Sequence, residues 1–168
     1  LLGTVYCSQL VLAQMKKRNY GKIINLCGGG VGGKNSLPRF SAYYTSKTAI
    51  AGFTEVLSEE TKDDNIRVNC IAPGAINSFF TDYLIAQGSE KAGKVMYQKA
   101  KDQKKNGGDS PELAGKLVAF LVSNKASHLT GCLLSAKWDT PESLENRSIS
   151  FSHFKLRRID QNSYIEKL

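Results

Sequence analysis

The chain has 168 residues, of which 41% are apolar and 23% charged, a globular composition that excludes a disordered polypeptide. It has no apolar run long enough to span a bilayer, and its net charge of +8 comes from scattered basic residues, which argues against nucleic-acid binding. The four cysteines form no CxxC pair, so no metal site is expected. Cysteines within apolar runs indicate reduced core thiols and a cytoplasmic location.

The first part of the chain predicts a helix, a strand and a second helix. Residues 1–17 have the apolar spacing of a helix. KIINL (22–26) is a short apolar run without alternation, as expected of a buried parallel strand. The Gly-rich segment 27–40 is predicted to be a loop. SAYYTSKTAIAGFTEVLSEETK (41–62) is predicted to be a long helix with Ser41 as its cap.

The second part continues the same alternation. IRVNCIAP (66–73) is a second buried-strand candidate that a Pro-Gly pair stops. Residues 75–109 are polar and predicted to be mostly loop, with one helix near 88–104. DSPELAGKLVAFLVS (109–123) has a serine cap followed by proline, a strong helix start. TGCLLSAKW (130–138) is the third strand candidate.

Strands that alternate with helices predict an α/β fold with a parallel sheet covered on both faces. Three strands are few for this design and leave an edge exposed. The chain therefore has the pattern expected of the C-terminal part of a doubly wound domain, over residues 1–139. Residues 140–168 are interpreted as a C-terminal extension.

Tyr43 and Lys47 are the first candidates for chemistry. They lie four residues apart, which places them on one face of the predicted helix. A free phenol has a pKa of about 10, and a neighbouring ammonium favours the phenolate. Tyr43 could then donate a proton to a carbonyl or remove one from an alcohol. The alternative is a surface pair of little energetic value.

These motifs resemble the short-chain dehydrogenase/reductase family. YxxxK opens a helix after the strand GKIINL, and IRVNCIAPGAINS follows with Asn69, Pro73 and Gly74, and with Ser78 where the family has threonine. The resemblance covers roughly residues 1–139. It implies a Rossmann-like fold whose N-terminal βαβαβ half, with its TGxxxGxG motif, is absent from this chain.

The resemblance also implies roles for particular residues. Tyr43 would be the general acid/base, and Lys47 would assist it and hold the nicotinamide ribose. Pro73, Gly74, Ile76 and Ser78, together with Tyr43 and Lys47, would contact NAD or NADP. The reaction would be hydride transfer between an alcohol and a ketone or aldehyde. Members often form dimers or tetramers through the helices expected here at 1–17 and 41–62.

The serine that polarises the carbonyl in this family is missing. Gly28 stands at its usual position, and Cys27 comes just before it. Relatives that read LSGGGA in this loop have serine at the position of Cys27, so Cys27 lies at or beside the usual serine position. Three substitutes are open: the Cys27 thiol, a backbone N–H of the glycine loop, or the hydroxyl of Ser36 or Ser41. A thiol is the weaker hydrogen-bond donor. Cys27 is equally consistent with a small buried residue at the end of a strand.

Other functions stay open at this stage. Trp138 and Asp139 are candidates for contacting a sugar-like substrate, although a packing role for Trp138 is the simpler interpretation. The chain could be a noncatalytic fragment of the family that does not bind cofactor. Sugar-nucleotide epimerases and dehydratases also use YxxxK but match the 66–78 region less well. A nucleic-acid-binding module would require strongly salt-dependent binding.

Overall fold

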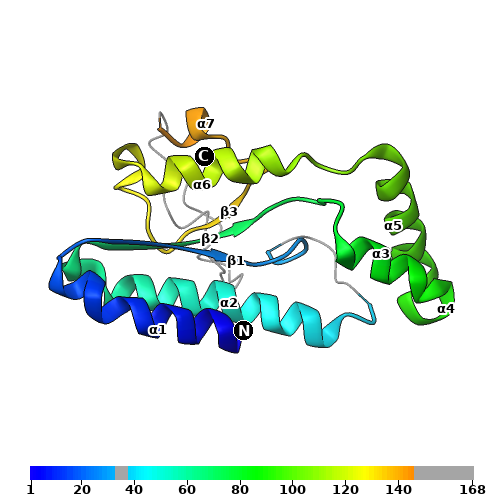
Figure 1. The fold of residues 1–168 in the computed structure, drawn as a ribbon, viewed down its shortest axis with the longest axis horizontal. Helices are drawn as coiled ribbons and strands as arrows, with labels where there is room; N and C mark the ends of the chain where they lie inside the picture. The colour runs from blue at the N-terminus through cyan, green and yellow to red at the C-terminus, as the bar shows by residue number, and fades with distance from the viewer. Residues whose placement is uncertain (33–37, 146–168) are drawn as a thin grey trace, which may run out of the picture.

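The computed structural model describes residues 1–32 and 38–145. A parallel sheet in the order β1-β2-β3 forms its centre, and the predicted α/β class is thereby confirmed. Its strands are β1 (Gly21–Leu26), β2 (Ile66–Ala72) and β3 (Leu133–Ser135). Helices α1 (Leu2–Lys17) and α2 (Ser41–Glu60) cover one face, and α6 (Pro111–Val122) covers the other (Figure 1).

Two apolar cores hold these layers together, one on each face of the sheet. On the α1/α2 face, Ile23, Leu57, Ile66 and Val68 are buried together. On the α6 face, the larger cluster includes Ile71, Leu117, Leu121 and Leu134. Each fully buried aliphatic side chain stabilises the fold by roughly 1.5–3 kcal/mol, so the sheet is fixed from both sides.

The predicted start of α6 is correct, whereas the predicted cap of α2 is not. Ser110 caps α6 as predicted, because its hydroxyl accepts a hydrogen bond from the Glu112 backbone N–H at 3.2 Å. The prediction of Ser41 as the cap of α2 is wrong. Phe40 occupies the cap position without a side-chain bond, and its carbonyl accepts from the Tyr44 N–H at 2.7 Å. The long helix therefore begins at Ser41 itself.

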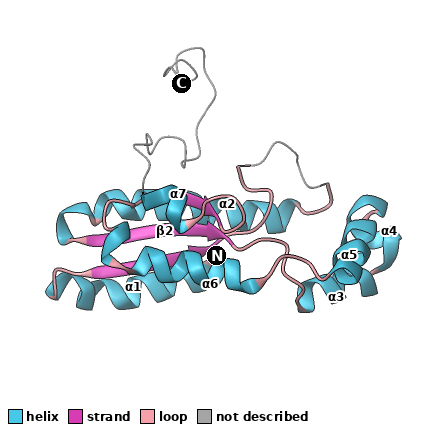
Figure 2. Ribbon diagram, turned by 90° about the horizontal axis from the view of Figure 1, so that it is seen from above, coloured by secondary structure: helices cyan, strands magenta, loops and turns pink. Residues whose placement is uncertain are grey.

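The prediction for residues 75–109 is correct only in part: the helix expected near 88–104 is present as α4 and α5, but the segment is not mostly loop. This segment contains three helices, α3 (Phe79–Ala86), α4 (Gly88–Ala92) and α5 (Lys94–Asn106). Gly88 and Gly93 have φ of 71° and 81°, a left-handed backbone that separates the helices. Leu84, Ala92 and Ala100 form a small core of their own with Phe40. The three helices lie beyond the end to which the strands point (Figures 1 and 2).

The third strand is shorter than predicted. β3 ends at Ser135, because the Asp139 carboxylate accepts from the Ser135 N–H at 2.7 Å and closes a turn there. Short helical turns fill the remaining connections: η1 (Lys62–Asp64), η2 (Asn124–Ala126) and α7 (Pro141–Glu145). Leu144 of α7 is buried in the α6-face cluster, so the first turn of the predicted extension packs against the domain. Residues 146–168 lie outside the described part.

Candidate active site

The predicted site residues gather at the carboxyl ends of the strands. β1 ends at Leu26 and leads into Cys27 and Gly28, while α2 supplies Tyr43 and Lys47. The segment 73–78 follows β2 at the same edge of the sheet. Ligands of open α/β sheets bind at this edge. Ser36, one of the possible serine substitutes, lies outside the described residues.

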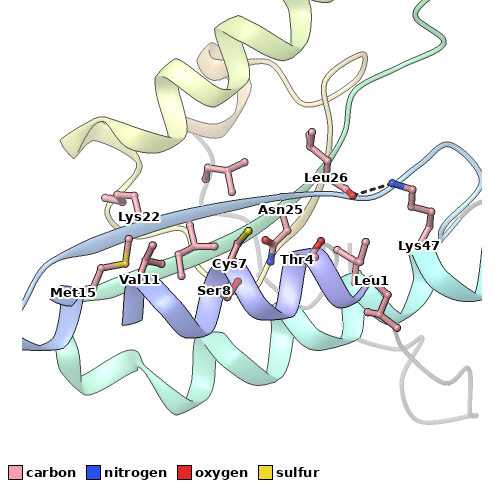
Figure 3. A pocket seen from close by; sticks show the side chains of 14 residues that line it. Leu1, Thr4, Cys7, Ser8, Val11, Met15, Lys22, Asn25, Leu26 and Lys47 are labelled. Atoms are coloured by element: carbon pink, nitrogen blue, oxygen red, sulfur yellow. Dashed lines mark hydrogen bonds between the residues drawn. The ribbon is translucent and has the colours of Figure 1, made fainter. Parts of the chain in front are cut away.

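Tyr43 and Lys47 are close neighbours on α2, and both are half-buried. The Lys47 Nζ atom lies 5.9 Å from the centroid of the Tyr43 ring. The same ammonium donates a hydrogen bond of 3.4 Å to the Leu26 carbonyl, which ties α2 to the end of β1 (Figure 3). The predicted spacing therefore brings the ammonium within cation–π range of the Tyr43 ring.

The pKa of the Tyr43 phenol does not move in the direction predicted from its lysine neighbour. Burial raises this pKa above its ordinary value, and the nearby Cys27 thiol adds to the rise. The Lys47 ammonium is engaged with the Leu26 carbonyl. Tyr43 is consequently protonated at neutral pH, the form that donates a proton to a carbonyl oxygen.

Gly28 makes room for the Tyr43 hydroxyl. A Cβ atom built on Gly28 would lie 2.3 Å from the Tyr43 Oη and 3.0 Å from its Cζ. The same Cβ would lie 3.4 Å from Cγ of Lys47. Position 28, where the resemblance to the family leads us to expect the serine, therefore has backbone only, directly beside the phenol oxygen.

Cys27 is engaged with the protein core. It is 3% exposed and packs with Ile50 and Cys70. Its thiol donates to the Ile71 carbonyl at 3.4 Å. A hydrogen bond between the two thiols lowers the pKa of Cys27 and, together with burial, raises that of Cys70. Ser41, the remaining serine candidate described, is exposed at the first position of α2.

An aromatic cluster surrounds Tyr43, and the sequence analysis missed it. The Phe80 ring of α3 stacks on the Tyr43 ring with centroids 5.3 Å apart and planes at 14°. Phe40 meets both rings edge-on, at 6.3 Å from Tyr43 and 6.4 Å from Phe80. The helical spacing of Phe80 and Leu84 after Ser78 was the available signal, because it marks the apolar face of α3.

The segment after β2 is braced by the residues just before α6. Asp109 Oδ2 accepts from the Ala75 N–H at 2.8 Å, and Ala75 accepts from the Asp109 N–H at 3.0 Å. Ile76 forms an antiparallel bridge with Gly108. Ser78 caps α3 in an extended conformation without a side-chain bond, so its exposed hydroxyl is not used by the helix. The predicted contact residues 73–78 thus form one fixed segment.

The family model described as short chain dehydrogenase matches residues 1–88, just over half of the chain. The chain belongs to the short-chain dehydrogenase family. Dehydrogenase/reductase SDR family member 4 of Sus scrofa is 35% identical over 129 residues, which cover 77% of this chain and 44% of that protein. The 3-oxoacyl-[acyl-carrier-protein] reductase of Chlamydia muridarum is 35% identical over 136 residues, covering 80% and 51%.

Solved structures of this dehydrogenase family share the fold. Acetoin dehydrogenase from Salmonella typhimurium superimposes with a TM-score of 0.58 at 30% identity, covering 80% of this chain and 49% of that one. An NADPH-dependent reductase involved in bacilysin biosynthesis gives a TM-score of 0.64 at 25% identity, covering 88% and 56%. The chain spans about half the length of the curated relatives it matches.

The donors at this site fit the nicotinamide cofactor of the dehydrogenase family. Lys47 offers an ammonium, and Tyr43 and Ser78 offer hydroxyls, the groups that bind ribose and phosphate oxygens. A separate open groove of about 590 Å³ also reaches Lys47, but Tyr43 and Ser78 do not line it (Figure 3). It runs between α1 and the edge of β1, and Ile50 lines it beside Lys47.

Among residues 1–32 and 38–145, no group of three or more His, Cys, Asp or Glu side chains is arranged to hold a metal ion. No helix in these two stretches is both long and apolar enough to cross a bilayer.

Proposed function

We propose that the protein is an NAD(P)-dependent oxidoreductase that interconverts an alcohol and a ketone or aldehyde. The observation that carries this proposal is the placement of the Tyr43 phenol beside Lys47 and the Gly28 backbone, at the carboxyl end of β1. The family relationship supports the same reaction class.

The mechanism assigns proton transfer to Tyr43. In the reducing direction, the neutral phenol donates its proton from Oη to the substrate carbonyl oxygen, and the carbonyl carbon gains a hydride. In the oxidising direction, the phenolate removes the hydroxyl proton. Lys47 stabilises the negative charge of the phenolate and supplies a donor for ribose hydroxyls. A bound nicotinamide cofactor supplies or accepts the hydride.

The remaining cofactor contacts belong to the segment braced by Asp109. We propose that the backbone at Pro73, Gly74 and Ile76, and the hydroxyl of Ser78, line the nicotinamide end of NAD or NADP. Cys27 remains a proposed helper at the position next to the missing serine. Its thiol would have to leave the Ile71 carbonyl to reach a substrate, which favours a backbone N–H near Gly28 as the polarising group.

The sugar-like substrate predicted from Trp138 and Asp139 has weaker support. The Trp138 side chain is 74% exposed, and the Lys137 ammonium lies 5.4 Å from its ring centroid. The Asp139 carboxylate is engaged within its own turn. We therefore propose only a small alcohol or carbonyl substrate. The free thiols of all four cysteines support a reducing compartment, and we propose the cytoplasm.

A noncatalytic relative is the alternative, favoured by the glycine at the serine position. The Tyr43→Phe variant distinguishes an enzyme that uses Tyr43 from a noncatalytic relative. Tyr44→Phe, at the neighbouring tyrosine, is the matched control. If Tyr43 is the acid/base, Tyr43→Phe lowers kcat at least about 100-fold because the ring keeps its packing but loses the proton. Tyr44→Phe retains activity.

Carbonyl-dependent oxidation of NADPH and NADH by both variants is the measurement, with melting temperatures to exclude unfolding. Equal activity of the wild-type protein and Tyr43→Phe would eliminate the proposed role of Tyr43. Absence of activity from the wild-type protein across ketones and aldehydes would favour the noncatalytic alternative.

A further inference from the structure

The ring of Tyr43 is held by more than its own helix. Phe80 stacks flat against it from α3, at 5.3 Å and 14°, while Phe40 closes one side edge-on at 6.3 Å and 85°. Offset-stacked and edge-to-face pairs are the favoured arrangements of aromatic rings. These contacts fix the plane of the phenol, and they come from outside the YxxxK motif.

Phe80 itself stands on a well-supported helix. The Gln103 side chain of α5 donates to Asn77 Oδ1 at 3.3 Å and to Thr81 Oγ1 at 3.2 Å. Lys104 pairs with Asp82 at 2.7 Å. These bonds attach α3 to α5 on both sides of Phe80, so the position of its ring is set by two helices.

The same helical unit is attached to the start of α2. The Arg39 guanidinium donates to the backbone carbonyls of Glu90 and Lys91 in α4. Phe40 packs into the small core with Leu84, Ala92 and Ala100. Helices α3–α5 therefore contact the chain at Arg39 and Phe40, just before α2, and place Phe80 against the Tyr43 ring.

We propose that Phe80 is a positioning residue, which holds the Tyr43 ring so that its hydroxyl points at the Gly28 backbone and shields one ring face from water. This inference rests on the proposed function, because it assigns to Phe80 the orientation of the acid/base. Phe80 is 41% exposed, so it contacts Tyr43 with one face and leaves the rest of its ring open beside the site.

Two consequences distinguish positioning from general packing. Loss of the Phe80 ring admits water to the Tyr43 ring, and because burial is the main reason for the raised pKa of Tyr43, that pKa falls toward its ordinary value. The hydroxyl also loses its fixed direction, which lowers kcat with little change in the KM for cofactor, since misplacement of a reacting group costs about ten- to a hundredfold in rate.

The test compares Phe80→Ala with Phe79→Ala as the matched control. Phe79 is 83% exposed, and its ring is stacked with Tyr83. The titration of Tyr43 is followed by NMR of the protein labelled with ¹³Cζ-tyrosine, with the resonance assigned through Tyr43→Phe. We expect Phe80→Ala to lower the pKa of Tyr43 and to lower kcat, Phe79→Ala to change neither, and Phe80→Tyr to behave as the wild type.

The titration needs no turnover, so the two proposals fail separately. If the Tyr43 titration is the same in the wild type and Phe80→Ala, the positioning role is overturned even where activity is present. If Phe80→Ala shifts the titration but no variant reduces a carbonyl, the proposed function fails and the contact stands. Should Phe80→Ala unfold, Phe80→Leu keeps part of the apolar cover without the flat ring and is expected to give a smaller downward shift with a lowered kcat; an unchanged titration and an unchanged kcat in Phe80→Leu would also overturn the role.

Discussion

The Tyr43 hydroxyl packs directly against the Gly28 backbone at the end of β1. This close packing limits which side chains can replace Gly28. From the resemblance to the family we expect a serine there, whereas this chain has backbone beside the phenol oxygen. A Cβ at 2.3 Å from Oη is far inside van der Waals contact. The phenol cannot yield freely, because Phe80 and Phe40 hold its ring.

We predict that Gly28→Ala displaces the Tyr43 hydroxyl and lowers kcat by about tenfold or more, because a displaced reacting group loses its alignment. Gly29→Ala is the matched control, since a Cβ on Gly29 would have no atom within 4 Å. Steady-state kinetics of the two variants make the comparison. Gly28→Ser should be impaired as well, although it restores the family's residue; higher activity in Gly28→Ser than in the wild type would contradict this account.

At the scale of elements, Asp109 connects three parts of the fold. Its carboxylate accepts from the Ala75 N–H after β2 and from Lys137 Nζ after β3, at 2.8 and 2.9 Å. Asp109 itself lies just before α6. Gly74 has φ of 97°, and a Cβ there would come within 3.0 Å of the Asp109 carboxylate, so glycine suits this close approach. The hydrogen bonds of Asp109 therefore hold the segment 73–78 at the site.

We predict that Asp109→Ala lowers the free energy of unfolding by about 1–2 kcal/mol, because the Ala75 N–H loses its acceptor. Lys137→Met removes only the ion pair and should cost less, about 0–1 kcal/mol, since the Lys137 side chain is 45% exposed. Urea denaturation of both variants and the wild type at pH 7 gives these differences.

The contribution of Asp109 also depends on pH. The backbone hydrogen bond from Ala75, followed by the hydrogen bond from Lys137, holds the pKa of Asp109 below its ordinary value. Its stabilisation is therefore fully present above the unfolded pKa of about 3.9 and is lost as the pH falls through the lower folded pKa. The difference between the wild type and Asp109→Ala should shrink below pH 3; an undiminished difference there would show that the carboxylate charge is not involved.

Local sequence signals found the elements whose cause is local. The unalternated runs gave β1 and β2, and Ser110-Pro111 marked the start of α6. Helix α3 was missed because its packing depends on Phe40, which is distant in sequence. The single helix predicted near 88–104 did not resolve the break between α4 and α5 at Gly93. The Cys27–Cys70 contact and the fit of Tyr43 against Gly28 are likewise tertiary. Residue spacing within a single helix or strand cannot predict contacts of this kind between different elements.

The whole molecule presents an apolar stripe along α1. Leu2, Tyr6 and Leu10 are 64%, 57% and 79% exposed and recur every four residues, so they lie on one side of the helix. Val56 of α2, on the same face of the sheet, is 58% exposed. Apolar groups that recur along one helix face mark an interaction surface more often than scattered ones do. The resemblance to the dehydrogenase family led us to expect self-association through these same two helices, and we propose that the exposed apolar side chains mediate it.

We predict that Leu10→Lys weakens self-association, because a buried lysine in the contact would have to lose its hydration. Val95→Lys on α5 introduces the same charge at a position that is 67% exposed and belongs to neither helix, so it should leave the assembly unchanged. Sedimentation velocity over a range of concentrations measures both variants. We expect the wild type and Val95→Lys to sediment as a dimer or tetramer and Leu10→Lys to shift toward the monomer. A wild-type protein that sediments as a single species of monomer mass would refute the proposed oligomer and leave the α1 stripe to another partner.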